Sequence, residues 1–192
     1  VEMMKPMGQP CWLCPRDCGA NRHLGQVGYC HMSDRVKLAR AALHFWEEPC
    51  ISGETGSGAV FFSGCNLGCV YCQNHLVASG RVAKEVSIQR LGQIYLELKQ
   101  KGAANINLVT PDHYVPQILT SLEWAAQRRL ELPIVYNTSS YAKTSVIALL
   151  KDKINIYLAD YKYTDAALAV RYSNAEDYPR AARAAIGEMV RQ

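Results

Sequence analysis

Seven of the eight cysteines in this chain fall into two tight groups whose spacing suits metal chemistry. The second group is Cys65, Cys69 and Cys72, a CxxxCxxC pattern. Three thiolates with this spacing can hold one corner of a cubane iron-sulfur cluster, whereas a simple ferredoxin cluster uses four cysteines. One iron would then stay open to bind a substrate or a cofactor. Gly64 and Gly68 allow the unusual backbone angles that such a tight loop needs.

Two other interpretations of this second group stay open. A zinc site would need a fourth ligand, which His75 could supply just three residues after Cys72. The three cysteines could also be core thiols without a metal. The position of the group directly after a predicted strand, at the start of a βα series, favours the cluster.

The first group of cysteines consists of Cys11, Cys14, Cys18 and Cys30. These four thiols can close around one metal centre, and His23 or His31 could replace one of them. A structural zinc and a second iron-sulfur cluster that conducts electrons fit this cysteine count equally well. A thiol oxidoreductase that uses the first two cysteines is disfavoured, because two further cysteines compete as ligands. Cys50 stands alone, and we expect a buried thiol there.

The elements that must position these cysteines follow from the hydrophobic pattern. Residues 1 to about 32 have no helical or alternating period, so we expect an irregular segment shaped by a metal. From about residue 58, apolar runs alternate with helix-like stretches, which predicts βα units and a parallel sheet. The predicted strands are 59–62, 106–109, 134–137 and 154–158. The predicted helices are 88–98, 115–126 and a last one near Asp177, which caps it, with Pro179 in its first turn.

These elements predict an α/β fold, specifically a partial (β/α) barrel of the TIM type. Four βα units cannot close the eight-stranded form, which needs about 250 residues, so we expect the chain to be truncated at its C-terminus. We divide it into a Cys-rich metal-binding segment, 1–57, and a partial barrel domain, 58–192. A complete small open sheet is the alternative, and it would have to protect the edge of its last strand.

The composition narrows the classes of function. About half of the 192 residues are hydrophobic, which disfavours disorder. The net charge is only +4 and no basic run is interleaved with aromatic residues, so we expect no nucleic-acid partner. No stretch is apolar over the length that spans a bilayer, and the start, Val1-Glu2-Met3-Met4-Lys5, does not lead into a signal peptide. We therefore expect a cytoplasmic protein without a membrane partner, in which clustered cysteines bind metal rather than form disulfides.

The sequence around the second group of cysteines resembles a known family. The segment CNLGCVYC at 65–72 matches the signature of the radical S-adenosylmethionine (SAM) superfamily, including the aromatic residue before the third cysteine. The flanking segments that also resemble this family are Cys11-Trp-Leu-Cys-Pro-Arg-Asp-Cys18, Glu47-Glu-Pro-Cys-Ile-Ser-Gly53, Phe61-Phe-Ser-Gly-Cys65, Val109-Thr-Pro-Asp-His113 and Asp160-Tyr-Lys162. Together they are similar to the uncharacterised iron-sulfur proteins that resemble pyruvate formate-lyase activating enzyme. The resemblance covers essentially the whole chain.

The resemblance implies a 4Fe-4S cluster on Cys65, Cys69 and Cys72, whose open iron chelates the amino and carboxylate groups of SAM. Reductive cleavage of SAM would give methionine and a 5'-deoxyadenosyl radical, which abstracts hydrogen from a substrate. By the same resemblance, Asp160 and Lys162 would lie near SAM, and the backbone around Tyr71 and Gln73 would approach its adenine. Thr110 and Asn137 follow strands whose ends should line the same site, so they are the further expected SAM contacts. The alternatives are that Thr110 and Asn137 are ordinary strand-end or capping residues and that Asp160 and Lys162 form a solvated surface pair. Where many members carry Gly-Gly-Glu to bind the SAM amino group, this chain has Val109-Thr110-Pro111, so that contact stays unassigned.

The expected function is therefore that of a radical SAM enzyme, with glycyl-radical-enzyme activation as its more specific form. The expected partners are SAM, an electron donor such as a flavodoxin or ferredoxin and, for the activating role, a protein substrate. The alternative is a non-catalytic iron-sulfur or zinc scaffold, or an electron carrier. A catalyst must bind SAM and form 5'-deoxyadenosine, whereas a carrier needs only to be reduced and reoxidised.

Overall fold

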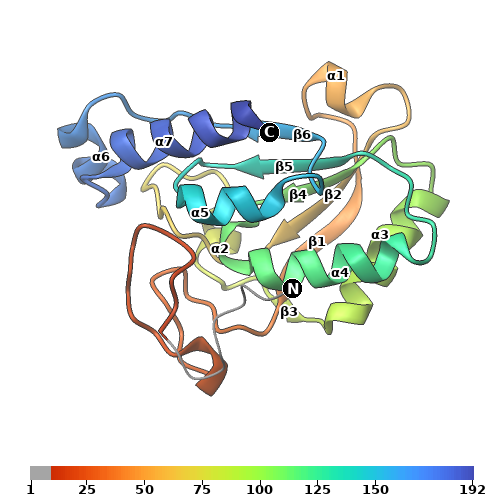
Figure 1. The fold of residues 1–192 in the computed structure, drawn as a ribbon, viewed down its shortest axis with the longest axis horizontal. Coiled ribbons are helices and arrows are strands. Elements are labelled where there is room, and N and C mark those ends of the chain that lie inside the picture. The colour runs from red at the N-terminus through yellow and green to blue at the C-terminus, as the bar shows by residue number, and fades with distance from the viewer. Residues whose placement is uncertain (1–9) are drawn as a thin grey trace.

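A six-stranded mixed sheet forms the centre of the molecule (Figure 1). The computed structural model describes residues 10–192 of the chain. The strands are β1 (Lys37–His44), β2 (Ser57–Phe62), β3 (Lys84–Glu85), β4 (Ile106–Val109), β5 (Ile134–Thr138) and β6 (Ile156–Ala159). Their order across the sheet is β3-β1-β2-β4-β5-β6. Strands β2, β4, β5 and β6 are parallel, and β1 pairs antiparallel with both β2 and β3.

Helices follow or connect most of these strands. They are α1 (Pro49–Ser52), α2 (His75–Ala78), α3 (Ile88–Gln100), α4 (Val115–Ala126), α5 (Thr144–Ile147), α6 (Ala166–Ser173) and α7 (Tyr178–Arg191). Short 3-10 turns occur at Arg22–Leu24, Asp112–Tyr114 and Ala148–Leu150. Helices α3 and α4 lie side by side against the sheet (Figure 1).

The main core lies between the sheet and helices α3 and α4. Leu91 and Tyr95 of α3 and Ile118 of α4 are fully buried, in one cluster with the strand residues Val60 and Leu108. Apolar residues recur every three to four positions along both helices, which turns one apolar stripe toward the sheet. Full burial of each such side chain stabilises the fold by about 1.5–3 kcal/mol.

The opposite face of the sheet is only partly covered. Phe61, Val109, Asn137 and Leu158 lie in register across the four parallel strands. Because successive side chains of a strand point to opposite faces, this row points away from the core under α3 and α4. All four residues are half-buried. The row therefore leaves a partly open surface that ends at the carboxyl edge of the parallel strands.

The α/β class predicted from the sequence is confirmed, and each predicted strand is present. Strand β6 begins at Ile156 rather than 154, while the antiparallel strands β1 and β3 were not predicted. Strands β3 and β6 are the two edges of the sheet, so the described residues form an open sheet and not a closed barrel. The predicted segment 1–57 contains β1, which pairs along its length with β2.

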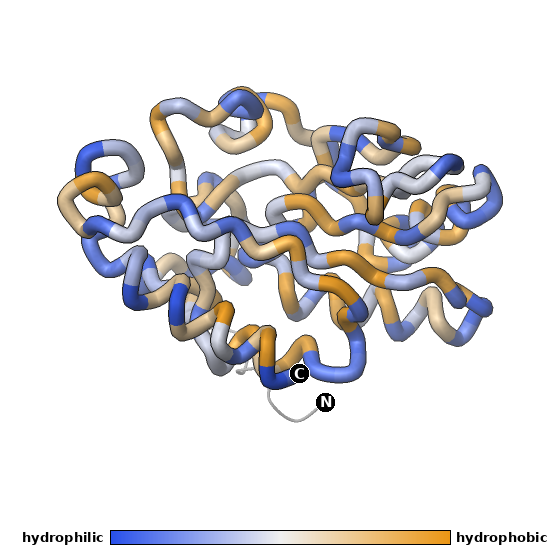
Figure 2. The backbone as a smooth tube through the Cα atoms, turned by 90° about the horizontal axis from the view of Figure 1, so that it is seen from above, coloured by the Kyte–Doolittle hydropathy of each residue, from blue (hydrophilic) through white to orange (hydrophobic). Residues whose placement is uncertain are grey.

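The last helix begins where its sequence predicts, but its cap differs. Helix α7 starts at Tyr178 with Pro179 in its first turn. The expectation that Asp177 caps this helix is wrong, because its side chain makes no capping hydrogen bond. Its carboxylate instead accepts a hydrogen bond of 2.5 Å from the Tyr141 hydroxyl. The helix alternates between hydrophobic and hydrophilic residues along its length (Figure 2), as expected of an amphipathic helix that lies on a surface.

The N-terminal segment is irregular, as expected. From residue 10 to residue 36 its only regular element is the 3-10 turn Arg22–Leu24. Leu13 and Met32 are nevertheless buried in the main core, which joins this segment to the sheet. The expectation about Val1-Glu2-Met3-Met4-Lys5 falls outside the described residues.

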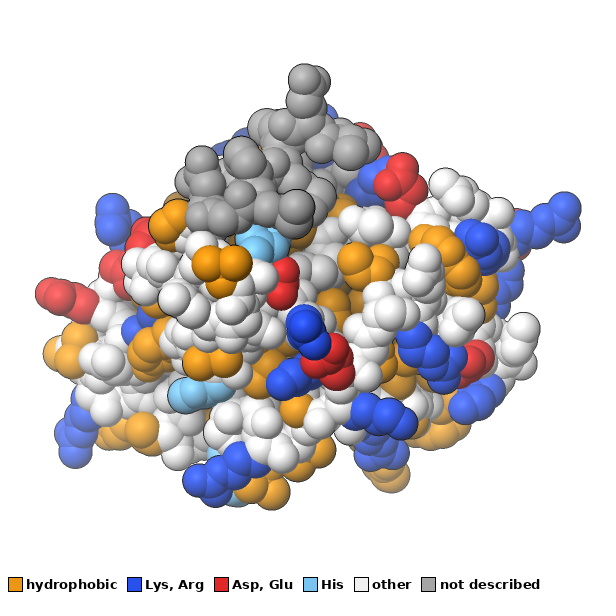
Figure 3. Space-filling model, turned by 90° about the horizontal axis from the view of Figure 1, so that it is seen from below, with side chains coloured by type: hydrophobic (Ala, Val, Ile, Leu, Met, Phe, Trp, Pro, Cys, Tyr) orange, Lys and Arg blue, Asp and Glu red, His pale blue; other side chains and the backbone are white. Residues whose placement is uncertain are grey.

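Two features of the molecule relate to possible nucleic-acid and membrane partners: the distribution of charge on its surface and the length and polarity of its helices. On the face in Figure 3, Lys and Arg side chains are more numerous toward the right and lower right, and a few Asp and Glu side chains lie among them. Among residues 10–192, none of the helices combines the length and the apolar character needed to cross a bilayer.

Candidate metal and cofactor site

The cysteine loop leaves the sheet at the end of β2, as the sequence predicts. Strands β2, β4, β5 and β6 are parallel and adjacent, so the segments that follow them emerge at the same edge. Parallel α/β proteins place their ligands at this carboxyl edge. Thr110, Asn137 and Asp160 lie at or directly after the ends of β4, β5 and β6. The predicted site residues therefore share one edge of the sheet.

Gly64 starts the cysteine loop in a conformation that other residues rarely adopt. Its φ is +87°, and its N–H donates to the Val77 carbonyl oxygen at 2.8 Å. A Cβ atom at this position would overlap the Cys30 carbonyl oxygen and lie 2.5 Å from Met32 Cγ. The glycine thus lets the loop approach the N-terminal segment closely.

Backbone N–H groups of the loop point at the first cysteine. The Leu67 N–H donates to Cys65 Sγ at 3.4 Å. Burial raises the pKa of the Cys65 thiol to about 11, while the N–H groups of Gly68 and Leu67 act in the opposite direction. Such N–H donors favour the thiolate, the form that binds metal. A positive partner beside Cys65 would favour its thiolate, and a bound metal is one such partner.

All three cysteines of the loop are free and half-buried. The Cys72 N–H donates to the Cys69 carbonyl at 3.1 Å, which closes a turn between these two residues. Among residues 10–192, no three His, Cys, Asp or Glu side chains are grouped as ligands of a single metal ion. The thiolates of a cubane bind separate irons, so they need not meet at one point. Three thiols on one tight loop, with N–H donors to sulfur, fit that donor set.

Asp160, Tyr161 and Lys162 form a D-x-K segment directly after β6, and the next residue, Tyr163, lies in the buried cluster against which Cys65 and Cys69 pack. Lys162 Nζ lies 2.7 Å from Asp160 Oδ2. Burial works to lower the pKa of the Lys162 ammonium, but the hydrogen bond and negative charge of Asp160 outweigh it and raise the pKa overall. Cys69 and Cys65 also raise the pKa of Lys162, by less than Asp160 does.

A tyrosine that sequence analysis missed ties two strand ends together. The Tyr178 hydroxyl accepts the N–H of Lys162 at 2.8 Å and donates to the Ser139 carbonyl oxygen at 2.8 Å. Tyr178 is fully buried at the start of α7. It joins the segments after β5 and β6 although it lies 16 residues beyond Lys162 in the chain. Nothing in the local pattern around Tyr178 indicates this contact.

The end of β4 is strained and tightly held. Thr110 has φ +57°, and its N–H donates to the Asn137 carbonyl oxygen at 2.9 Å. A β-branched residue with positive φ is a genuine outlier, and such strain is often found at functional sites. Asn137 belongs to the half-buried row on the open face of the sheet. Both predicted residues therefore lie beside that face.

Two buried titratable residues follow Thr110. Asp112 accepts hydrogen bonds from the hydroxyls of Thr138 (2.8 Å) and Tyr136 (3.1 Å). Burial raises the pKa of Asp112 to about 6, although both hydroxyls lower it. His113 Nε2 lies 2.8 Å from the Ser63 carbonyl oxygen, and burial lowers the pKa of His113 to about 3. His113 is thus neutral, with its proton on Nε2, and it ties this segment to the start of the cysteine loop.

The predicted SAM contacts Tyr71 and Gln73 lie in an exposed part of the loop. Tyr71 is 55% exposed, and its ring meets the rings of Tyr163 and Tyr172 edge-on, each at 6.3 Å between centroids. The N–H of Val70 donates to the Tyr172 carbonyl oxygen at 2.9 Å. Helix α6 therefore supports the aromatic end of the loop.

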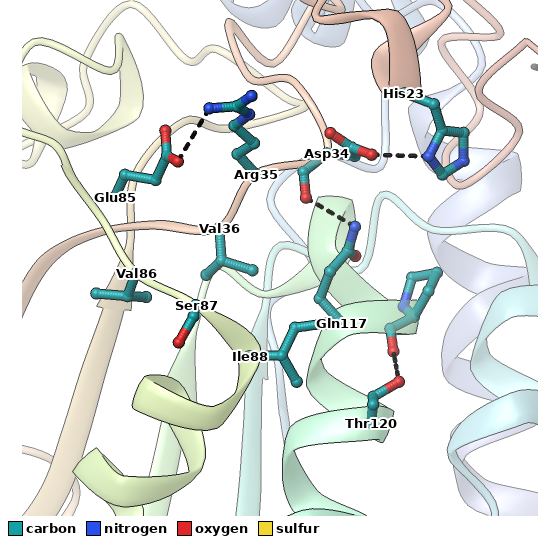
Figure 4. Close-up of a pocket in the computed structure, with 11 residues that line it drawn as sticks. His23, Asp34, Arg35, Val36, Glu85, Val86, Ser87, Ile88, Gln117 and Thr120 are labelled. Carbon is teal, nitrogen blue, oxygen red and sulfur yellow. Dashed lines mark hydrogen bonds and ion pairs between the residues drawn. The ribbon is translucent and has the colours of Figure 1, made fainter. Parts of the chain in front are cut away.

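A pocket of about 620 Å³ lies between the starts of α3 and α4 and the segment before β1, and no cysteine is among its described lining residues (Figure 4). His23 Nδ1 lies 2.7 Å from Asp34 Oδ2, and Arg35 Nη1 lies 3.3 Å from Glu85 Oε1. Gln117 donates to the Asp34 carbonyl oxygen at 2.9 Å.

Cys50 belongs to neither group of cysteines. It is exposed on α1, so the expectation that its thiol is buried is wrong.

The chain is similar to an uncharacterised protein of Methanocaldococcus jannaschii. The two are 26% identical over 185 residues, which is 93% of this chain and 53% of that protein. The chain thus spans about half the length of this relative. No protein-family model matches the chain, and no solved structure matches it.

Proposed function

We propose that this chain is part of a radical SAM enzyme, in which Cys65, Cys69 and Cys72 hold a 4Fe-4S cluster. The observation that carries the proposal is the meeting of the CxxxCxxC loop with the D-x-K segment at the carboxyl edge of parallel strands. Tyr163, the residue after Lys162, belongs to the buried cluster against which Cys65 and Cys69 pack, and its ring meets the ring of Tyr71 in the cysteine loop. These segments are about 90 residues apart in the sequence, and the resemblance assigns both to the same cofactor site.

The residues around the loop have separate tasks in this proposal. Bound on the three thiolates, the cluster supplies the open iron and the electron that cleave SAM to methionine and a 5'-deoxyadenosyl radical. Lys162 and Asp160 offer a cation and an anion for the polar groups of SAM. Tyr71 and the backbone at Gln73 border the adenine. These fixed groups place SAM without reorganisation, which is the contribution of a protein to cofactor chemistry.

The partly open face of the sheet extends the proposed site. The row Phe61, Val109, Asn137 and Leu158 runs across the four parallel strands near their carboxyl ends, close to the edge from which the cysteine loop leaves. Three of these side chains are apolar and exclude water from a reactive radical, while the Asn137 amide offers hydrogen bonds to SAM. In this proposal the open sheet is the first part of a radical SAM type (β/α) barrel, and the row lines its interior.

The substrate class and the protein partners are further proposals, which rest on the resemblance to activating enzymes. By resemblance to activating enzymes, the radical would be delivered to a glycine of a partner protein. A flavodoxin or ferredoxin would supply the electron. The exposed side of the loop around Tyr71 gives such a donor access to the cluster.

The test is the iron and acid-labile sulfide content of anaerobically purified and reconstituted protein, for the wild type, Cys72→Ala and Cys50→Ala. We expect about four irons and four sulfides that are lost in Cys72→Ala and retained in Cys50→Ala, because Cys50 is exposed and remote. The same samples are then assayed for SAM binding and for 5'-deoxyadenosine.

Each failure of this test has its own meaning. Equal iron and sulfide in Cys72→Ala and the wild type would refute the cluster assignment. A cluster that neither binds SAM nor forms 5'-deoxyadenosine would refute the enzyme and leave an electron carrier. Zinc at these cysteines without sulfide would leave a zinc scaffold.

A further inference from the structure

Arg16 reaches from the irregular N-terminal segment to the loop that carries the cysteines of the proposed site. Its guanidinium donates to four backbone carbonyl oxygens, those of Asn66, Leu67 and Ser173, each at 2.8 Å, and that of Asn174. A planar guanidinium carries five N–H donors in a fixed fork, and here all three of its nitrogens donate. Arg16 therefore ties the cysteine loop to the C-terminal end of α6, where the exposed carbonyl groups of a helix favour a cation.

The charge of this guanidinium has no carboxylate partner. None of the ion pairs between residues 10–192 includes Arg16. Its Cζ atom lies instead 3.8 Å from the ring centroid of Tyr29 and 5.1 Å from that of Tyr141. Aromatic faces and carbonyl oxygens attract a cation through partial charges only. The half-buried positive charge of Arg16 is thus available to a negative group beside the loop.

One of the four carbonyl groups belongs to a peptide that also contacts the first cysteine. Arg16 Nε donates to the Asn66 carbonyl oxygen at 2.8 Å. The N–H of the same peptide group belongs to Leu67, and it donates to Cys65 Sγ at 3.4 Å. A single peptide group therefore separates the guanidinium from the sulfur. A cation at the carbonyl end polarises that peptide group and strengthens the hydrogen bond that its N–H donates.

We propose that Arg16 is a positioning residue that raises the reduction potential of the proposed cluster, by fixing and polarising the Asn66–Leu67 peptide group against the Cys65 sulfur. The inference rests on the proposed function, because it needs a cluster at Cys65. Reduction by one electron from the flavodoxin or ferredoxin adds one negative charge to the cluster and its thiolates, without breaking a bond or moving a proton. Hydrogen bonds to sulfur and the local charge set the potential of an iron-sulfur centre, and a cation stabilises the added electron.

The experiment measures the reduction potential of the cluster by anaerobic redox titration with detection by electron paramagnetic resonance. The samples are the reconstituted wild type, Arg16→Gln, Arg16→Lys and a control. Arg16→Gln keeps N–H donors at this position without the charge, whereas Arg16→Lys keeps the charge without the planar fork. A clamp that only holds the loop would not distinguish the two variants by charge.

Arg128→Gln is the matched control. Arg128 Cζ also lies 3.8 Å from an aromatic centroid, that of Trp124, and its Nη1 donates to a carbonyl oxygen, that of Trp124, at 3.0 Å. It follows the end of α4, however, on the side of the sheet from which the parallel strands begin. This control therefore removes a similar arginine far from the cysteine loop.

The expected result is a graded shift of the potential. A neighbouring opposite charge shifts the equilibrium of a titrating group by about tenfold or more, and the same electrostatics applies to an added electron. We expect the equilibrium constant for reduction to fall about tenfold in Arg16→Gln, which is a potential about 59 mV more negative. The potential of Arg16→Lys should lie between those of Arg16→Gln and the wild type, and Arg128→Gln should match the wild type.

Two outcomes of the titration would overturn the proposal: an unchanged potential in Arg16→Gln, or an equal shift in Arg16→Gln and Arg16→Lys. A measurement on the wild type decides the question even if a variant does not fold. In the reduced protein with isotope-labelled leucine, electron-nuclear double resonance should detect the Leu67 N–H as an exchangeable proton coupled to the cluster, and its absence would rule out the contact through this peptide. Failure of the proposed function is distinguishable, because equal iron and sulfide in Cys72→Ala and the wild type would remove the cluster, and this inference with it, before any potential is measured.

Discussion

Replacing Gly64 by Ala tests the close approach between the N-terminal segment and the cysteine loop. The new Cβ atom would meet the Cys30 carbonyl oxygen and Met32 Cγ. The backbone would also have to hold φ +87° with a side chain present. Both effects act directly before Cys65, the first proposed cluster ligand.

The two effects have separate magnitudes. Placing an L-residue in the left-handed region costs about 1–2 kcal/mol. Forcing an extra carbon into a packed contact costs about 1–3 kcal/mol more, and here one of the obstructing atoms is backbone that cannot rotate away. We therefore expect Gly64→Ala to lower the free energy of unfolding by about 2–5 kcal/mol.

Gly102→Ala is the matched control. Gly102 has φ +85° at the end of α3, but a Cβ atom there would have nothing within 4 Å. This variant should lose only the backbone part, about 1–2 kcal/mol. Urea unfolding under anaerobic, reducing conditions measures both, and a further 2 kcal/mol would lower the midpoint by roughly 1 M. If the two variants unfold at the same urea concentration, the close approach at Gly64 does not exist.

The remaining predictions concern titration and SAM binding. The pKa of Asp112 is raised to about 6, so the folded state binds its proton before the unfolded state does, and this stabilises the fold as the pH falls from about 6 to about 4. His113 acts in the opposite direction: its pKa is lowered to about 3, so it destabilises the fold below its ordinary pKa of 6.5. Asp112→Asn removes the first effect, so urea unfolding should lose stability more steeply from pH 6.5 to pH 4.5, by up to about 1.4 kcal/mol per pH unit; a slope equal to that of the wild type would contradict this. Lys162→Ala should weaken SAM binding without altering iron content. Lys153→Ala, at the amino-terminal ends of the parallel strands, is the control and should leave both unchanged. Equal SAM affinity in the two variants, measured by calorimetry, would remove Lys162 from the site.

The sequence by itself was enough to predict the α/β class, the four parallel strands and the place of the cysteine loop. These features depend on local patterns, because an apolar run forms a buried strand and a helical stripe packs on it wherever they occur. The sequence also located Thr110, Asn137 and Asp160 at strand ends, since the chain order of parallel strands sends those ends to one edge. The same local reasoning failed for Cys50, whose exposure depends on what surrounds α1.

Only the tertiary structure decided which distant groups meet. β1 pairs antiparallel with β2 although residues 37–44 follow a segment without regular structure. Arg16 binds carbonyl groups that are 50 or more residues away, and Tyr178 joins the segments after β5 and β6. A guanidinium or a hydroxyl has many acceptors in a chain, so its partner is fixed by packing and not by its own sequence neighbours. For that reason spacing could suggest the cysteine ligands, whereas the side chains that hold their loop in place became visible only in the fold.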